Sequence, residues 1–179
     1  MLTFITSSVD KLAEVERLLG RPLARESLVL EEIQAIELEP VVHHKARQAF
    51  AALGRPVLVE DTGLAFAAWN GLPGALIKWF LTSLGAVGIC RLLRHETNRE
   101  ATATTAFAYY DGVTMRVFSG AVRGMIPEAP RGSFGFGWDV IFQPLASVRT
   151  FAEMTPEEKD QFSMRRIALG QLHDSGVLI

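Results

Sequence analysis

The sequence predicts a mixed α/β fold, and three of its patterns lead to this prediction. Short apolar runs rich in β-branched residues, such as LTFIT at 2–6, are typical of strands. Longer segments repeat leucine and valine at helical spacing, as in SSVDKLAEVERLLG at 7–20. The pair Asp111-Gly112 joins two strand-like segments and is a strong signal of an antiparallel hairpin. Helices and strands therefore share one chain, and part of its sheet is antiparallel.

The first third of the chain alternates strands with helices. The expected order is a strand at 2–6, a helix at 7–20, a strand at 27–30, a helix at 40–53 and a strand at 56–60. Gly20 and Gly54 stand where the two helices should end, and Pro40 stands where the second should begin. The run PVLVE at 56–60 is apolar almost throughout, which is typical of a buried strand.

The rest of the chain adds helices and the hairpin. Two helices are expected at 74–85 and 85–95, and two strands within 101–122. TPEE at 155–158 is typical of a helix start, because Thr155 can cap the helix and Glu158 completes a capping box. If that helix continues, Lys159 and Ser163 share a face. The simpler interpretation of this segment is an ordinary amphipathic C-terminal helix.

Composition limits the class of protein. The chain has 179 residues, 49% hydrophobic and 21% charged, so we expect a single domain over 1–179 with a sizeable core. Its net charge of -2 argues against a nucleic-acid partner, which usually requires a basic excess. The single cysteine, Cys90, fits a reducing compartment. No apolar run is long enough to span a membrane, and the N-terminus does not resemble a signal peptide. We therefore expect a cytoplasmic protein without a membrane partner.

The segment TSSVDK at 6–11 joins the first strand to the first helix and carries hydroxyl groups and a lysine. A helix N-terminus presents free N–H groups and a partial positive charge, so it can hold phosphate, and Lys11 would add a full charge. The simpler alternative is an N-cap by Ser7 or Ser8, with Lys11 in solvent. The two interpretations are compatible.

The segment VEDTGL at 59–64 places two carboxylates, Glu60 and Asp61, where the buried strand is expected to end before a glycine turn. Ligands of α/β sheets bind outside the carboxyl ends of strands. Mg²⁺ often takes one or two carboxylates together with phosphate oxygens. The segment thus indicates either a metal site or a polar strand end with a turn. No P-loop pattern accompanies it.

The segment SFGFGWDVIF at 133–142 crowds aromatic rings and glycines together. Gly135 and Gly137 would let the backbone pass close to a flat ligand, on which an aromatic ring could stack. Asp139 could accept hydrogen bonds from the N–H groups of a base. The alternative is a glycine-kinked strand whose aromatic side chains belong to the core.

Six segments, taken together, resemble the inosine triphosphate pyrophosphatase (Ham1-like) family. They are TSSVDK, EEIQ, VEDTGL, GLPGALIKWFL, FGWDVIFQP and TFAEMTPEEKDQFSMRR, in the order and spacing of that family over nearly the whole chain. The resemblance implies a long central mixed sheet, flanking helices in two lobes around a nucleotide cleft, and a homodimer. The activity it implies is hydrolysis of nucleoside triphosphates, preferably ITP, dITP and XTP, to monophosphate and pyrophosphate, with Mg²⁺ as cofactor.

The resemblance also implies roles for individual residues. Catalytic roles fall to Asp61, as general base for a water attacking the α-phosphorus, to Glu60 beside it and to Lys11. The Mg²⁺ ligands would be Glu32 and Asp61. Phe136 would stack on the base, and Arg165 would reach a base carbonyl. The whole set expected to bind the substrate is Thr6, Ser7, Ser8, Lys11, Lys45, Thr62, Lys78, Phe136, Gly137, Trp138, Asp139, Lys159, Ser163, Met164 and Arg165.

Two positions depart from the motifs of the family. Ser8 replaces an asparagine of the first motif, and Met164 replaces a histidine of the last. A histidine can donate a hydrogen bond to a purine carbonyl and a methionine cannot, so the base preference is open. The alternatives are the same chemistry on another nucleotide, such as a pyrimidine one, or a homologue that binds nucleotides without turnover. The retained metal carboxylates favour an enzyme.

Overall fold

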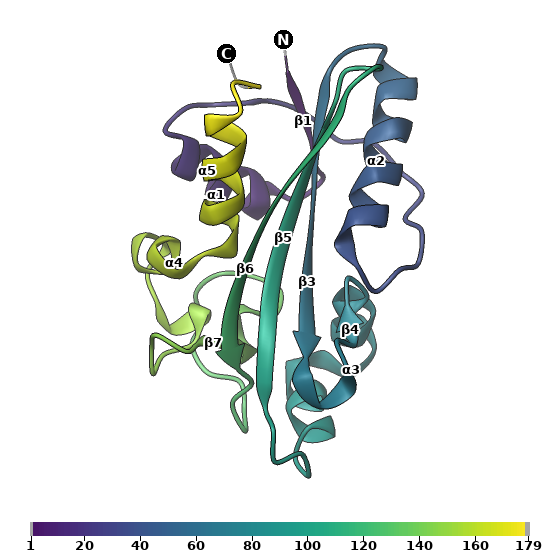
Figure 1. The fold of residues 1–179 in the computed structure, drawn as a ribbon. Helices are drawn as coiled ribbons and strands as arrows, with labels where there is room; N and C mark the ends of the chain where they lie inside the picture. The colour runs from purple at the N-terminus through teal and green to yellow at the C-terminus, as the bar shows by residue number, and fades with distance from the viewer. Residues whose placement is uncertain (1, 178–179) are drawn as a thin grey trace.

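A computed structural model describes residues 2–177 and shows one mixed seven-stranded sheet with helices on both faces (Figure 1). The strands are β1 Thr3–Ile5, β2 Ala24–Glu26, β3 Val57–Phe66, β4 Pro73–Gly74, β5 Glu100–Tyr110, β6 Met115–Met125 and β7 Gln143–Pro144. The helices are α1 Val9–Leu19, α2 Leu38–Leu53, α3 Ile77–Leu92, α4 Pro156–Phe162 and α5 Met164–Asp174. The strand order is β2-β1-β3-β5-β6-β7, with β4 paired to β3. The pairs of β1 are parallel and the others antiparallel, which confirms the predicted mixed sheet.

The hairpin of β5 and β6 forms much of the length of the sheet (Figure 1). Its turn lies where the sequence predicts it. Asp111 Oδ1 accepts hydrogen bonds from the N–H groups of Val113 and Thr114 at 2.9 and 2.7 Å. Gly112 takes a φ of 97°, which favours glycine. The predicted hairpin is therefore confirmed.

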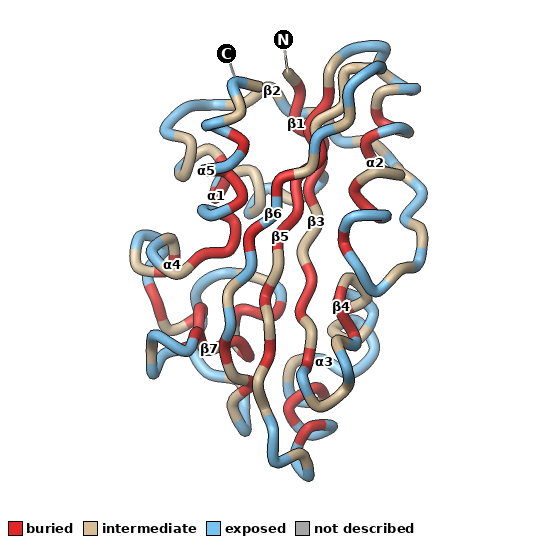
Figure 2. The backbone as a smooth tube through the Cα atoms, in the orientation of Figure 1, coloured by how far each residue is buried: buried red, intermediate tan, exposed pale blue. Residues whose placement is uncertain are grey.

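Helices divide the molecule into two lobes along the sheet (Figure 1). In one lobe, α1 and α5 cover one face of the strands and α2 covers the other. Alternation along β3 produces two cores there: Val57 and Val59 face α2, and Leu58 faces α5. In the other lobe, Ile77 of α3 and Phe142 belong to a third core. Figure 2 shows that the buried stretches of the chain follow the strands and parts of the helices.

Two elements in the first third of the chain differ from those that the sequence predicts. The strand expected at 27–30 is wrong, because β1 offers only three residues for pairing and β2 uses them. Leu28 and Leu30 pack against the core under α2 instead. That helix begins at Leu38 rather than Pro40. A proline fits its first turn, since the first N–H groups of a helix have no partner within the helix.

The sequence predicts that β3 ends at the two carboxylates, and this prediction is wrong. The strand continues through Asp61 and Thr62 to Phe66, because β5 pairs with it over this whole length. Gly63 is not a turn residue. A Cβ there would lie 3.0 Å from the carbonyl carbon of Gly74, so glycine permits the close approach of β4. The carboxylate that we expect to bind metal therefore stands within a paired strand.

α3 combines the two helices expected at 74–85 and 85–95. Its backbone is not helical at Gly85, where φ is 66° and ψ is 171°, so the predicted boundary is confirmed. Within residues 2–177, no helix is both long and apolar enough to cross a membrane.

The predicted start of α4 is confirmed in detail. Thr155 Oγ1 accepts a hydrogen bond from the N–H of Glu158, and Glu158 Oε2 accepts one from the N–H of Thr155. The helix ends at Phe162, and Ser163 caps α5 instead of continuing α4. Lys159 and Ser163 consequently do not share one helix face.

Candidate active site

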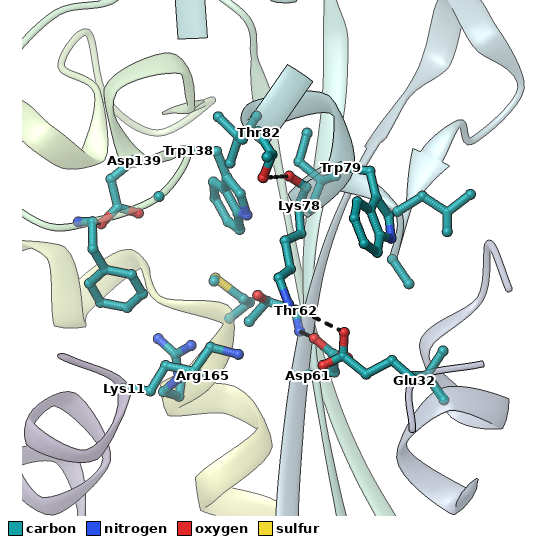
Figure 3. A pocket seen from close by; sticks show the side chains of 18 of the residues that line it. Lys11, Glu32, Asp61, Thr62, Lys78, Trp79, Thr82, Trp138, Asp139 and Arg165 are labelled. Carbon is teal, nitrogen blue, oxygen red and sulfur yellow. Dashed lines mark hydrogen bonds and ion pairs between the residues drawn. The ribbon is translucent and has the colours of Figure 1, made fainter. Parts of the chain in front are cut away.

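A pocket that collects most of the predicted site residues lies where β1 ends. β1 stops at Ile5, which pairs with Val59, so the next residues of β3 have no β1 neighbour at this edge. The carboxyl end of a strand is a usual place for ligands in α/β proteins. The pocket has a volume of about 260 Å³ (Figure 3). The predicted residues that line it are Lys11, Glu32, Asp61, Thr62, Lys78, Phe136, Gly137, Trp138, Asp139, Lys159, Met164 and Arg165.

The other predicted residues lie next to this lining. Thr6, Ser7 and Ser8 form the turn between β1 and α1. Ser8 Oγ accepts a hydrogen bond from the N–H of Lys11 at 3.1 Å, so Ser8 is the N-cap. Its own N–H donates to Thr6 Oγ1 at 3.1 Å. The cap thus holds Lys11 in the first turn of α1. The remaining three residues, each within reach of a lining side chain or its backbone, are Lys45, Glu60 and Ser163.

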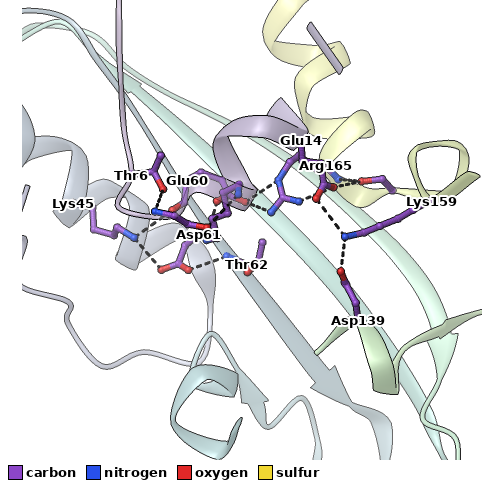
Figure 4. Close-up of polar contacts among 12 residues, drawn as sticks. Thr6, Glu14, Lys45, Glu60, Asp61, Thr62, Asp139, Lys159 and Arg165 are labelled. Carbon is purple, nitrogen blue, oxygen red and sulfur yellow. Dashed lines mark hydrogen bonds and ion pairs between the residues drawn. The ribbon is translucent and has the colours of Figure 1, made fainter. Parts of the chain in front are cut away.

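Glu60 and Asp61 project to opposite faces of β3, because successive residues of a strand alternate. Glu60 meets Arg165 on the face covered by α5, and Asp61 meets Lys45 on the face covered by α2 (Figure 4). The two carboxylates therefore have separate partners. The catalytic role expected for Glu60 stays a prediction, whereas its structural partners are clear.

Buried ion pairs hold Glu60 in its charged form. Arg165 Nη2 lies 2.7 Å from Glu60 Oε1, and Lys11 Nζ lies 2.8 Å from Oε2. Burial alone would raise the pKa of Glu60, but the charges of Arg165 and Lys11, with their hydrogen bonds, lower it to about 2. Burial acts to lower the pKa of Arg165, and the neighbouring carboxylates outweigh it and raise that pKa. Both groups are charged at neutral pH.

Glu14 of α1 extends these ion pairs toward the aromatic loop, which is the segment 133–142. Arg165 Nη1 lies 2.7 Å from Glu14 Oε1, and Lys159 Nζ lies 3.3 Å from Oε2. The same Lys159 ammonium lies 2.7 Å from Asp139 Oδ2 (Figure 4). Burial raises the pKa of Asp139, although the charge of Lys159 opposes it. Residues from α1, α4, α5 and the aromatic loop are thus joined in one buried cluster.

The aromatic stretch is a loop with bends and a short 3₁₀ turn, not the glycine-kinked strand of the alternative interpretation. Asp139 Oδ2 accepts the N–H of Phe136 at 2.9 Å and so fixes the loop. Gly135 has a φ of 73°, and a Cβ there would lie 2.2 Å from the same oxygen, so a side chain does not fit. Trp138 is 6% exposed and belongs to a core, while Phe136 is half-buried at the pocket. Side chains of this stretch therefore contribute both to the core and to the pocket.

The predicted metal ligands meet on the α2 side of the pocket. Lys45 Nζ lies 3.4 Å from Asp61 Oδ2 and 3.6 Å from Glu32 Oε1. Lys78 of α3 extends toward Glu32, with its Nζ 3.4 Å from Oε2 (Figure 3). Partial burial raises the pKa of Glu32, but the charges of Lys45 and Lys78 together lower it. The part of the chain that the structure describes contains no group of three or more His, Cys, Asp or Glu side chains suited to a metal.

Glu14, Trp79 and Thr82 are among the residues of the site that were not predicted from the sequence. Glu14 joins two buried cations, Lys159 and Arg165, that lie far away in the sequence, so no local pattern indicates its role. Trp79 and Thr82 line the pocket from α3. Trp79 belongs to the segment GLPGALIKWFL, which resembles the family, but the position of the Trp79 side chain at the pocket depends on the path of α3.

Comparisons with known proteins agree over nearly the whole length of the chain. The model of the Ham1 family matches residues 2–175. An inosine triphosphate pyrophosphatase of Kluyveromyces lactis is 43% identical, over 97% of this chain and 94% of that protein. A HAM1 protein from Coxiella burnetii has a solved structure with a TM-score of 0.83, 27% identity and full coverage of both chains. The structure of a nucleoside-triphosphatase / dITP/XTP pyrophosphatase from Mycobacterium abscessus is 31% identical with a TM-score of 0.77, over 96% of this chain and 98% of that one.

Fold and site together define a two-lobed α/β protein with a charged pocket at the edge of its sheet. More narrowly, the chain belongs to the Ham1 family. The resemblance seen in the sequence, and with it the enzyme class, is confirmed.

Proposed function

We propose that the protein is a Mg²⁺-dependent nucleoside triphosphate pyrophosphatase that releases a monophosphate and pyrophosphate. The substrates we propose are non-canonical purine nucleotides such as ITP, dITP and XTP, in line with the names of its relatives. One observation of this chain carries the proposal. Its 18 basic residues include four lysines, and all four lie at the pocket. Three of them, Lys11, Lys78 and Lys159, line it, and Lys45 pairs with two lining carboxylates.

The lysines suit a triphosphate. Phosphoryl transfer depends mainly on positioning and on neutralising charge, which several ammonium groups around one pocket supply. Lys11 stands in the first turn of α1, where the helix N-terminus adds a partial positive charge. Lys78 reaches into the pocket from α3, on the other side from Lys11 (Figure 3). We propose that the phosphates lie between them.

Glu32 and Asp61 fit a Mg²⁺ ion. Each carboxylate has an oxygen within 3.6 Å of the same Lys45 ammonium, so one cation already reaches both. Two carboxylates with phosphate oxygens are a usual Mg²⁺ environment. When bound, Mg²⁺ would neutralise charge on the phosphates. We assign Asp61 as the general base, because its carboxylate lines the pocket and can accept a proton from water.

The opposite end of the pocket suits a base. The Phe136 ring is half-buried and offers a face for stacking. Two cations lie near the ring centroid, the Lys159 ammonium at 4.8 Å and the Arg165 guanidinium carbon at 5.9 Å. Met164 is 1% exposed and also lines the pocket. We propose that these residues, with Trp138 and Asp139, surround the base.

The second candidate is the same reaction on a different nucleotide, and Met164 favours it. The thioether lines the pocket where the family motif has a histidine, and it cannot donate a hydrogen bond to a purine carbonyl. A role in nucleotide binding without turnover explains the site less well, because a pure binder has no need for two metal carboxylates.

A panel of nucleotides tests the proposal. Pyrophosphate release is measured from ITP, XTP, dITP, GTP, ATP and UTP, with Mg²⁺ and with a chelator. We expect release that requires Mg²⁺ and is fastest with the non-canonical purines. Fastest release from UTP would favour the second candidate. No release from any of the six with Mg²⁺ would reject both.

A further inference from the structure

The four carboxylate oxygens of the proposed metal ligands are all engaged by groups of the protein. Lys78 Nζ donates to Glu32 Oε2 at 3.4 Å, and Lys45 Nζ lies 3.6 Å from Glu32 Oε1. Asp61 Oδ2 accepts from Lys45 Nζ at 3.4 Å, and Oδ1 accepts from the N–H of Thr62 at 2.8 Å. Figures 3 and 4 show these side chains turned toward one another. A metal ion that binds both carboxylates must compete with the two lysines.

Lys45 is the lysine that reaches both carboxylates, and it is firmly held. Its ammonium also donates to the backbone carbonyl of Glu60 at 3.2 Å. Three acceptor oxygens therefore lie within 3.6 Å of the Lys45 ammonium. This number matches the three N–H donors of an ammonium group. The Lys45 side chain is only 12% exposed, so its ion pairs are less screened than pairs on the surface. Its charge lies within 3.6 Å of one oxygen of Glu32 and one of Asp61, where it competes with any cation that these two oxygens would share.

We propose that Lys45 is an internal counter-ion that excludes free divalent metal from the nucleotide-free site. The carboxylates are neutralised before a metal arrives, and Mg²⁺ loses its water shell reluctantly. The metal enters together with a nucleotide, whose phosphates give Lys45 and Lys78 new anionic partners. This second step rests on the proposed function. The exclusion of free metal rests on the lysine contacts alone.

The test is the affinity of the nucleotide-free protein for Mn²⁺, measured by isothermal titration calorimetry. Lys45→Met should bind Mn²⁺ about fivefold more tightly than the parent, or better, because two unit charges 4 Å apart interact by about 1 kcal/mol even in water. Lys45→Arg keeps the charge and should resemble the parent. Arg47→Met removes a charge from an exposed position of the same helix and should also resemble the parent.

If Lys45→Met does not fold, Lys45→Gln replaces it, because it also removes the charge and its amide can still donate to the Glu60 carbonyl; the same tightening is expected. Lys78→Met provides a further measurement, of the competition at Glu32 alone. Lys78 is 68% exposed, so its loss should leave folding unaffected. It should tighten Mn²⁺ binding by a smaller factor, about threefold, because only Glu32 is released.

Unchanged or weaker Mn²⁺ binding in Lys45→Met would overturn the proposal, since the lysine would then support the metal site rather than compete for it. Release of pyrophosphate by the parent separates the two claims. Tighter Mn²⁺ binding in Lys45→Met without any release by the parent would reject the proposed function alone. Release by the parent with unchanged Mn²⁺ binding in Lys45→Met would reject the counter-ion alone.

Discussion

Glu60 and Asp61 are consecutive residues of β3, yet their carboxylates lie on opposite faces of the strand. Glu60 is enclosed between Lys11 and Arg165, whereas Asp61 faces the pocket beside Lys45. Adjacent acids of one motif thus have different environments. We expect Asp61 to act in the reaction and Glu60 chiefly to hold the site together.

Asp61→Asn should abolish most turnover while leaving the fold intact. Loss of a positioned general base typically costs about 10²–10⁴ in rate, and the amide keeps the shape of the side chain. The measurements are kcat with ITP and Mg²⁺ and a thermal melt. Asp174→Asn is the matched control, because it makes the same change from carboxylate to amide at an exposed residue at the end of α5. It should retain full activity. Full activity of Asp61→Asn would remove its assigned role.

Glu60→Gln should instead lower stability. The change leaves Arg165 buried with one carboxylate partner fewer, and breaking a buried ion pair from one side costs about 3–5 kcal/mol. Unfolding in urea at pH 7 measures the loss. A free energy of unfolding equal to that of the parent would show that Glu60 is not a structural anchor.

The pKa of Glu60 predicts how stability depends on pH. Its value is about 2 in the folded protein and 4.5 ordinarily, so the folded state favours the charged form. The resulting stabilisation, about 3 kcal/mol, is present above pH 4.5 and is lost as the pH falls through 2. The lowered pKa of Glu14 acts in the same direction, and the raised pKa of Asp139 acts against it.

Urea unfolding between pH 6 and pH 2 tests this dependence. The parent should lose stability steeply below pH 4.5, and Glu60→Gln should lose about 3 kcal/mol less over the same range. If the free energy of unfolding falls equally with pH in the two proteins, Glu60 is not the group with the lowered pKa.

How far the sequence predicts this structure depends on how local each feature is. The capping box of Thr155 and the turn at Asp111-Gly112 involve neighbours only, and both are confirmed. The continuation of β3 past its carboxylates depends on β5, so it was not visible from the motif itself. Glu14 was missed because its partner Lys159 lies 145 residues away.

Met164→His should shift base preference toward inosine. Met164 is buried and lines the pocket, and its thioether cannot donate a hydrogen bond. One added hydrogen bond to a neutral carbonyl is worth about 1 kcal/mol, so kcat/KM for ITP and XTP should rise several-fold relative to ATP and UTP. If the parent already prefers ITP by orders of magnitude and the variant is no different, this residue does not set the preference.

We further predict a homodimer that uses the outer side of α3. Leu84, Val87 and Leu92 are large apolar residues exposed on this helix, and a second copy could cover them. Light scattering at micromolar concentration should give twice the mass of the chain, and Val87→Glu should lower it. A monomer mass for the parent would reject the dimer.

In the proposed reaction, water attacks the α-phosphorus and releases pyrophosphate. Hydrolysis of ITP with Mg²⁺ in water enriched in ¹⁸O, followed by mass spectrometry of both products, shows which phosphorus atom the water attacks. We expect one ¹⁸O atom in inosine monophosphate and none in pyrophosphate. Label in pyrophosphate, or orthophosphate as the initial product, would contradict it.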